Sequence, residues 1–276
     1  MKTIIIILCV LLGLLFLWVL ALCAKRKKAD FWGLAAFDYA HRGLHDSNKG
    51  IPENSLLAFR LAAEHSYGAE LDVHLSKDKR LVVMHDESLI RTAGVDRNIC
   101  DMTAQELSAV RLEGTQEKIP FLEELLPMFA GKTPLVVEIK TKGRNSAELT
   151  RLTCEMLDQH PDVRYCMESF DPRVLLWLRR HRPDVIRGQL SANFIKDRNN
   201  LSLPLAFLLK NLLMNFITLP HFVAYKQEDR NGLSFRLCRA IWGVQEFNWT
   251  IRSEQVADAT KRDGRLVIFE HCRPKR

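Results

Sequence analysis

Short apolar runs recur along most of the chain and alternate with segments in which the apolar residues have helical spacing. Runs of about four to eight apolar residues, bounded by polar ones, are typical of strands buried in a parallel sheet. They predict eight strands, at residues 37–40, 68–73, 135–139, 165–168, 186–190, 222–225, 244–248 and 265–269. Helical patterns follow them, as at residues 54–65, 146–159 and 172–180. This alternation predicts an α/β fold, a (β/α)8 TIM barrel.

The segment between the second and third predicted strands does not follow the simple alternation. Residues 76–130 contain a short strand at 81–84, a loop with Gly94, and helical patterns at 103–110 and 121–129. We interpret this segment as a small insertion after the second strand.

The chain begins with a long apolar segment. Residues 4–24 carry no charge, and about 20 such residues cross a bilayer as a helix. A cleaved signal peptide is the competing interpretation, but no A-x-A-type site follows. Leu22 precedes Cys23 where a lipoprotein signal needs a small residue, so an uncleaved anchor is the preferred interpretation. The predicted organisation is an anchor, a basic juxtamembrane connector and one barrel domain, at residues 1–24, 25–36 and 37–276.

The charge distribution bears on partners and on orientation. The basic string Lys25-Arg26-Lys27-Lys28 directly follows the apolar segment, which favours a position of the barrel domain on the cytoplasmic side. This string, Lys2 and three basic residues at the carboxyl end account for eight positive charges, whereas the net charge is +7. The barrel itself is therefore close to neutral, which argues against nucleic acid as a partner. The basic string is suited to anionic membrane lipid, and no protein partner is predicted.

Acidic residues stand at the ends of two predicted strands. Glu70 and Asp72 point to the same face because strand side chains alternate, and so do Glu138 and Lys140. Active sites of such barrels lie at the carboxyl ends of the strands. Carboxylate oxygens suit Mg²⁺, Ca²⁺ or Mn²⁺ rather than Zn²⁺. A divalent-cation site is the preferred interpretation, although ion pairs with barrel arginines or helix capping would also use these residue types.

Histidines and basic residues complete the candidate chemistry. His41 and His85 follow strand-like runs beside charged neighbours, and imidazole can exchange a proton near neutral pH. Arg42 and Lys140 supply positive charge for a phosphate, and an ion pair with a barrel carboxylate is the competing interpretation of Arg42. Glu53 lies in a predicted helix start and could also support Arg42 or the metal site.

Five strings in this order carry a family resemblance: His41-Arg42-Gly43, Pro52-Glu53-Asn54-Ser55, Glu70-Leu71-Asp72, Val82-Val83-Met84-His85-Asp86 and Glu138-Ile139-Lys140. Together they resemble the glycerophosphodiester phosphodiesterase family, a group of phospholipase C-like phosphodiesterase barrels, from about residue 37 to about residue 274. The chain is similar to a membrane-anchored member of bacterial type. The resemblance implies a TIM barrel that uses a divalent cation to hydrolyse glycerophosphodiesters to sn-glycerol 3-phosphate and an alcohol.

The resemblance also implies roles for single residues. His41 and His85 correspond to the general acid–base pair, and the metal ligands would be Glu70, Asp72 and Glu138. Arg42 and Lys140 would bind the phosphate. Trp249 would lie against the glycerol, although a core tryptophan is a competing interpretation, and Phe170 would line the same wall.

The chain departs from the family pattern at two positions. The family often ends its eighth strand in Thr-Asp followed by Pro, whereas this chain has Glu270 there. After Trp249-Thr250 the family usually has an asparagine, and here Arg252 takes its place. We expect both changes to alter the mouth of the site and therefore substrate choice.

The segment at residues 201–219 leaves two interpretations open. Its leucines and Phe216 recur at helical spacing, as expected for a buried barrel helix or for an interfacial helix that docks on the bilayer. Docking would favour lipid-derived diesters. The alternatives to the predicted function are a related barrel phospholipase, D- or C-like, that acts on lysophospholipid or intact lipid, and a membrane protein that binds phosphodiesters without turnover.

Overall fold

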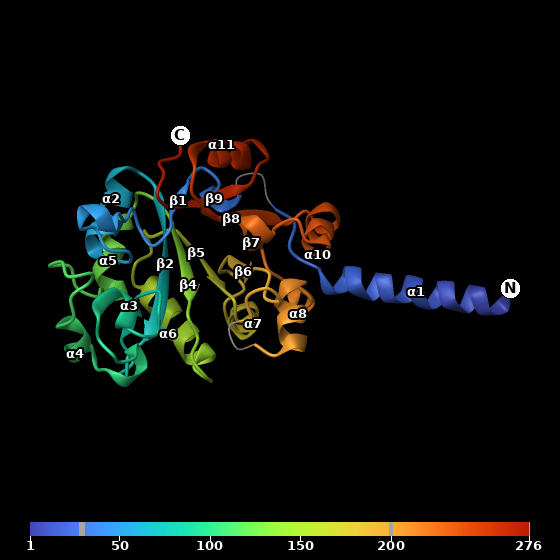
Figure 1. Cartoon of the computed structure of the whole chain (residues 1–276), viewed down its shortest axis with the longest axis horizontal. Coiled ribbons are helices and arrows are strands. Elements are labelled where there is room, and N and C mark those ends of the chain that lie inside the picture. Colours follow the sequence, from blue (N-terminus) through green and yellow to red (C-terminus); the bar gives the residue numbers. More distant parts are fainter. Residues whose placement is uncertain (28–30, 199–200, 276) are drawn as a thin grey trace.

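Eight parallel strands form a closed barrel in the computed structural model, which describes residues 1–27, 31–198 and 201–275 (Figure 1). Each strand pairs in parallel with the next, and the first pairs with both the second and the last. The strands are β1 Tyr39–Ala40, β2 Gly68–Leu75, β4 Leu135–Ile139, β5 Tyr165–Ser169, β6 Arg187–Ser191, β7 Phe222–Lys226, β8 Gln245–Ile251 and β9 Leu266–Phe269. The predicted TIM barrel is confirmed, with every predicted strand present.

Helices cover the outside of the barrel between consecutive strands. They are α2 Leu56–Glu64, α5 Leu122–Phe129, α6 Ser146–Asp158, α7 Pro172–His181, α8 Leu203–Lys210, α9 Asn215–Thr218, α10 Leu233–Leu237 and α11 Glu254–Arg262. Several begin at a side-chain cap: Ser55 accepts a hydrogen bond from the Ala58 amide, and Ser253 accepts one from the Val256 amide. Apolar faces of α2, α5, α6 and α7 pack on the strands in the largest hydrophobic cluster.

An aromatic layer closes the amino-terminal end of the barrel. Phe31 lies in the short 3-10 turn η1 (Phe31–Gly33), and its ring centroid is 5.9 Å from those of Phe222 and Phe247. Gly188 leaves the space for this layer, because a Cβ there would lie 2.0 Å from the Phe222 ring. Phe31 and Leu34 are fully buried, so the folded unit includes residues of the predicted connector.

The insertion after β2 has a small core of its own. It contains β3 (Leu81–Val83), which runs antiparallel to β2, then α3 (Ile90–Ala93), η3 (Ile99–Asp101) and α4 (Ala104–Ser108). Helix α5 belongs to the barrel, because Leu122, Leu125 and Phe129 are buried in the main cluster. The insertion is therefore shorter than the predicted range 76–130.

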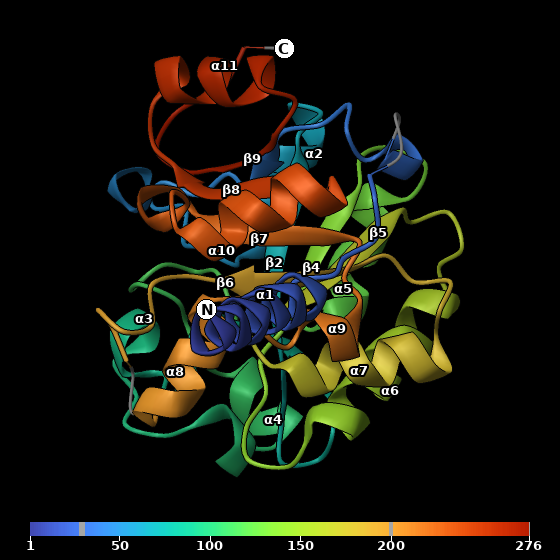
Figure 2. The same cartoon turned by 90° about the vertical axis from the view of Figure 1, so that its right-hand side faces the viewer.

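Helix α1 (Lys2–Ala21) projects from one side of the barrel as a rod (Figure 1). It is long and apolar enough to cross a membrane, and none of its residues is buried. Its carboxyl end is fixed to the domain, where Leu22 is buried in a cluster with residues of β7 and α10. The view down α1 places α8, α9 and α10 around its base (Figure 2).

The apolar segment after β6 does not form one continuous helix. Helix α8 ends at Lys210 and α9 begins at Asn215, because Leu212 between them adopts a left-handed backbone with φ of 56°. Ala206 and Leu209 are buried, whereas Leu205 and Phe216 are exposed. The buried residues agree with the interpretation of a barrel helix, and docking on the bilayer stays a prediction. The remaining short turns are η2 Ser47–Lys49, η4 Gln227–Asp229 and the π-helical η5 Cys238–Trp242.

Candidate active site

A cavity of about 220 Å³ opens at the carboxyl ends of the barrel strands. Eight of the ten predicted site residues line it, namely His41, Arg42, Glu70, His85, Glu138, Lys140, Phe170 and Trp249. Asp72 lies directly beside it, 3.1 Å from Lys140. Glu53 lies behind Arg42. The barrel therefore brings together residues that span more than 200 positions of the chain.

Strand register places the acidic residues in one row. Asp72 pairs with Glu138 on the neighbouring strand, and Glu138 pairs with Glu168 on the next one. Glu70 stands two residues before Asp72 on the same face of β2. Glu70, Asp72 and Glu138 are all buried, and each offers one oxygen within 4.8 Å of the others. This spacing allows three hard oxygen atoms to share one cation.

The electrostatics of this trio are unfavourable without a further positive charge. Burial raises the pKa of Glu70 well above its usual range, and the charges of Asp72 and Glu138 raise it further. Burial is also the largest cause that raises the pKa of Glu138 to about 7. Burial would raise the pKa of Asp72 as well, but the Lys140 charge holds it well below its usual value. A divalent cation fits this donor set, because it would offset the mutual repulsion of the carboxylates.

Two cations of the chain already lie against the trio. Lys140 Nζ is 3.1 Å from Asp72 Oδ1 and 3.0 Å from Glu138 Oε1. The Arg42 amide donates to Glu70 Oε2 at 3.0 Å, and its guanidinium lies 3.0 Å from Glu53 Oε1. Arg42 has a left-handed φ of 54°, which places its amide and its side chain on different carboxylates. Both cations border the cavity, where they can attract a phosphate.

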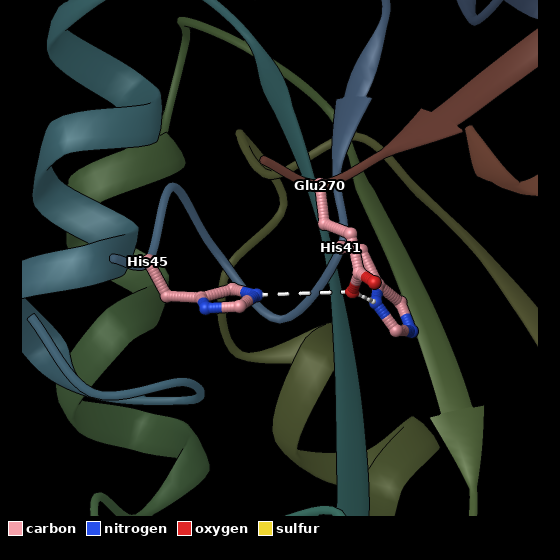
Figure 3. Close-up of side chains that lie close together, drawn as sticks. All are labelled: His41, His45 and Glu270. Carbon is pink, nitrogen blue, oxygen red and sulfur yellow. Dashed lines mark hydrogen bonds and ion pairs between the residues drawn. The ribbon is translucent and has the colours of Figure 1, made fainter. Parts of the chain in front are cut away.

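Glu270 holds His41 in one orientation (Figure 3). Its Oε2 accepts a hydrogen bond from His41 Nδ1 at 2.7 Å. The other ring nitrogen, Nε2, is 4.0 Å from Glu70 Oε2. Burial lowers the pKa of His41 to about 4, so the imidazole is neutral at pH 7 and Nε2 presents a lone pair to the carboxylate trio. His45 lies on the other side of Glu270, with its Nε2 3.9 Å from Oε2 (Figure 3).

His85 is held by a second carboxylate, from the insertion. Its Nδ1 lies 2.6 Å from Asp86 Oδ1, and Arg91 Nε donates to Asp86 Oδ2 at 2.5 Å. Arg91 also donates to Glu53 Oε1 at 2.5 Å. Glu53 therefore joins two arginines, Arg42 and Arg91, and connects the insertion to the barrel.

Two aromatic side chains form part of the cavity wall. Trp249 Nε1 donates to the Ala224 carbonyl at 3.1 Å, which fixes the indole. Its ring centroid is 5.7 Å from that of Phe170, in an edge-to-face arrangement. Both residues border the cavity, as expected for a wall that packs against the carbon skeleton of a ligand.

The fold and this geometry agree with a comparison against known protein families. The model of the glycerophosphoryl diester phosphodiesterase family matches residues 41–262. The chain belongs to this family. Among curated relatives of the chain, lysophospholipase D GDPD1 of Rattus norvegicus is 33% identical over 153 residues, which are 51% of this chain and 46% of the relative. A glycerophosphodiester phosphodiesterase of Caldanaerobacter subterraneus is 38% identical over 110 residues, 37% of this chain and 44% of the relative. The chain thus spans less than half the length of these two relatives.

Solved phosphodiesterase structures cover more of the chain. The phosphodiesterase OLEI02445 of Oleispira antarctica, in complex with the product sn-glycerol-3-phosphate, superposes with a TM-score of 0.67. It is 26% identical and covers 85% of this chain and 92% of its own. A glycerophosphodiester phosphodiesterase of Thermotoga maritima gives a TM-score of 0.62 at 27% identity, over 84% of this chain and 94% of its own.

Two acidic residues at the site were not assigned a role from the sequence. Glu168 borders the cavity, and burial raises its pKa well above its usual range; its position at the end of a predicted strand was the available signal. Glu270 was noted only as a departure from the family pattern. The structure pairs it with the other departure, since Arg252 Nε donates to Glu270 Oε1 at 2.7 Å. The two unusual residues therefore form one ion pair, which contacts His41.

Proposed function

We propose that the protein hydrolyses glycerophosphodiesters to sn-glycerol 3-phosphate and an alcohol, with a divalent cation such as Mg²⁺, Ca²⁺ or Mn²⁺. The observation that carries this proposal is the convergence of three buried carboxylates, two cations and two carboxylate-held imidazoles on one cavity. The family match and the product complex of the Oleispira structure support it.

Each group of residues at the site would have its own role in the reaction. Glu70, Asp72 and Glu138 would hold the cation, which supplies charge stabilisation to the phosphoryl group as negative charge develops. Arg42 and Lys140 would bind the remaining phosphoryl oxygens. One of the two imidazoles would accept the proton of the attacking oxygen, and the other would protonate the departing alkoxide.

The decisive experiment is an assay of the full chain in lipid nanodiscs. Glycerophosphocholine, glycerophosphoethanolamine and glycerophosphoglycerol would be supplied with Mg²⁺ or Ca²⁺, and with a chelator in parallel. We expect each diester to release its alcohol only with the cation. His41→Ala and His85→Ala should each lower kcat at least about a hundredfold, whereas His65→Ala, an exposed histidine of the barrel surface, should not.

The products separate this function from its alternatives. A D-like phospholipase would release the headgroup from an intact diacyl lipid, and a C-like one would release a phosphorylated headgroup. A protein that binds a diester with the cation but gives no product would be a binding protein. Any of these results would contradict the proposal.

We further propose that α1 is an uncleaved anchor with the barrel on the cytoplasmic side. Leu22 is completely buried in the domain, and Trp242 Nε1 donates to the Val19 carbonyl at 3.0 Å. Cleavage near Cys23 would remove these contacts from the domain. The basic residues after the helix favour the cytoplasmic orientation.

Mass spectrometry of the membrane-extracted protein tests the anchor. We expect an intact mass that includes residues 1–24. A mature chain that begins after Ala21 would show that the helix is a signal sequence. A cysteine introduced at the exposed position Glu155 could be labelled in sealed vesicles, and its reactivity would show on which side of the membrane the barrel lies.

A further inference from the structure

A second, larger cavity adjoins the candidate active site. Its volume is about 590 Å³, within the range of small-molecule sites. It shares Glu138, Lys140 and Phe170 with the catalytic cavity. Away from this shared wall, Phe194, Leu201, Leu205, Leu209 and Met214 form an apolar wall, and the polar residues of the lining are His74, Thr141, Ser169, Asp171 and Arg173. The phosphodiester site therefore continues into a groove with one apolar wall.

The aromatic side chains form a continuous path between the two cavities. Phe170 stands at the junction, with its ring centroid 5.7 Å from that of Trp249 on one side and 5.7 Å from that of Phe194 on the other. Beyond Phe194, the path continues to Ala206 and Leu209 on the buried side of α8. A chain of carbon atoms that starts beside Trp249 would remain in contact with apolar side chains to the far end of the groove.

The groove opens on the side of the barrel that carries the apolar helix α1. Outside α1, nine large apolar side chains of the described residues are exposed, and six of them lie on α8, α9, α10 and η5. Helices α8, α9 and α10 surround the base of α1 in the view along that helix (Figure 2). They include Leu205, which lines the groove and is 40% exposed. A membrane crossed by α1 would therefore lie beside the groove entrance.

We propose that the groove is a binding subsite for the single acyl chain of a monoacyl glycerophosphodiester that enters from the membrane. The inference rests on the proposed function and names a substrate class for the same site. The phosphate would bind at the carboxylates and Lys140, the glycerol would lie by Trp249, and the chain would pass Phe170 into the groove. Water would then displace the headgroup alcohol at phosphorus, and the alcohol would leave with a proton.

The test compares substrates that differ only in the acyl chain. The full chain in nanodiscs would be assayed with glycerophosphocholine and with hexanoyl, octanoyl and decanoyl lysophosphatidylcholine, each below its micelle concentration. Burial of each added methylene gives up to about a fourfold gain in kcat/KM. We expect a gain of at least about tenfold from hexanoyl to decanoyl, with choline as the released alcohol.

Two leucines of α8 provide a matched pair of variants. Leu205→Gln places an amide in the groove, and it should lower the ratio of kcat/KM for the decanoyl substrate to that for glycerophosphocholine about fivefold. Leu203 is on the same helix, is 54% exposed and does not line the groove. Leu203→Gln should leave this ratio unchanged, and melting curves would verify that both variants fold.

The results of this test distinguish a failure of the acyl subsite from a failure of the proposed function. Hydrolysis of glycerophosphocholine with no dependence on chain length would overturn the acyl subsite and leave the proposed function intact. A chain-length dependence that Leu205→Gln does not reduce would place the acyl chain elsewhere. No hydrolysis of any of the four substrates with the cation present would overturn the proposed function itself.

Discussion

The two sides of the reaction centre are built on opposite principles. The β1–β2–β4 side holds three buried carboxylates whose charges oppose one another, together with the lysine and arginine that partly offset them. Beyond β5 and β6, aromatic and aliphatic side chains make up the apolar side, although Glu168, Asp171 and Arg173 also border the two cavities there. Buried charges are costly unless they are paired, whereas an apolar wall costs little. The charged side therefore lowers the stability of the fold, and its charges are suited to chemistry. The side chains of the apolar side can differ with the substrate at little cost in stability.

The functional groups of the charged side have carboxylate partners that hold them in place. His41, Arg42 and His85 are each held by a carboxylate, from Glu270, Glu53 and Asp86 respectively. Such partners fix the orientation of functional groups before a ligand arrives. On the apolar side, the groove residue Leu205 is 40% exposed.

The largest expected effect comes from one carboxylate of the trio. Glu70→Gln should lower kcat/KM about a thousandfold, because a ligand of the cation is lost from the centre where charge develops. In a chelator its melting temperature should equal or exceed that of the parent protein, because the change removes a repelled, buried charge. Activity and thermal unfolding of the same preparation measure both effects.

The cation itself gives a second readout of the same variant. At about 100 times its Kd, a cation that binds only the folded state adds about 2.7 kcal/mol to the free energy of unfolding, or roughly 5–10 °C in Tm. Glu70→Gln should lose most of this shift, and the exposed control Glu155→Gln should keep it. A full cation-induced shift in Glu70→Gln would show that the cation binds elsewhere.

An intermediate effect is expected at Glu270, as a positioning residue for His41. Glu270→Leu should lower kcat about a hundredfold, because His41 Nδ1 loses its acceptor. Glu270→Gln keeps an acceptor oxygen and should retain about tenfold more activity than the leucine variant. KM should change less than about twofold in both, because the phosphate is bound by other groups.

Arg252→Gln serves as the matched control for Glu270. It removes the second partner of the carboxylate but leaves the hydrogen bond to His41, so kcat should fall only a few fold, by roughly the effect of a partly exposed ion pair. Equal losses in Glu270→Gln and Glu270→Leu would show that Glu270 does not act through a hydrogen bond to His41.

Much of the charged side could be predicted from the sequence because its geometry is local. Alternation along β2 puts Glu70 and Asp72 on one face, and parallel strands bring their carboxyl ends to one edge, so Glu138 joins them. The partner of His41 could not be predicted in this way. Glu270 is 229 residues away in the chain, and only closure of the barrel between β1 and β9 makes the two residues neighbours.

The apolar side was less predictable for a different reason. The helical spacing of leucines after β6 predicts apolar helix but cannot show that the helix breaks at Leu212, whose left-handed backbone separates α8 from α9. Whether Leu205 is covered depends on this break and on the packing of Phe194 against α8. These are tertiary features, and periodicity does not report them.

The smallest expected effect lies where the two sides meet. Phe170→Leu keeps an apolar side chain at the junction but removes the edge-to-face contacts with Trp249 and Phe194, each worth about 0.5–1.5 kcal/mol. We expect KM for glycerophosphocholine to rise about threefold and kcat to change less than twofold, because the carboxylates and imidazoles are untouched. Phe121→Leu, in the insertion and away from the cavity, is the control. A large loss of kcat in Phe170→Leu would mean that the apolar wall positions the reacting atoms, and the separation of the two sides would then be wrong.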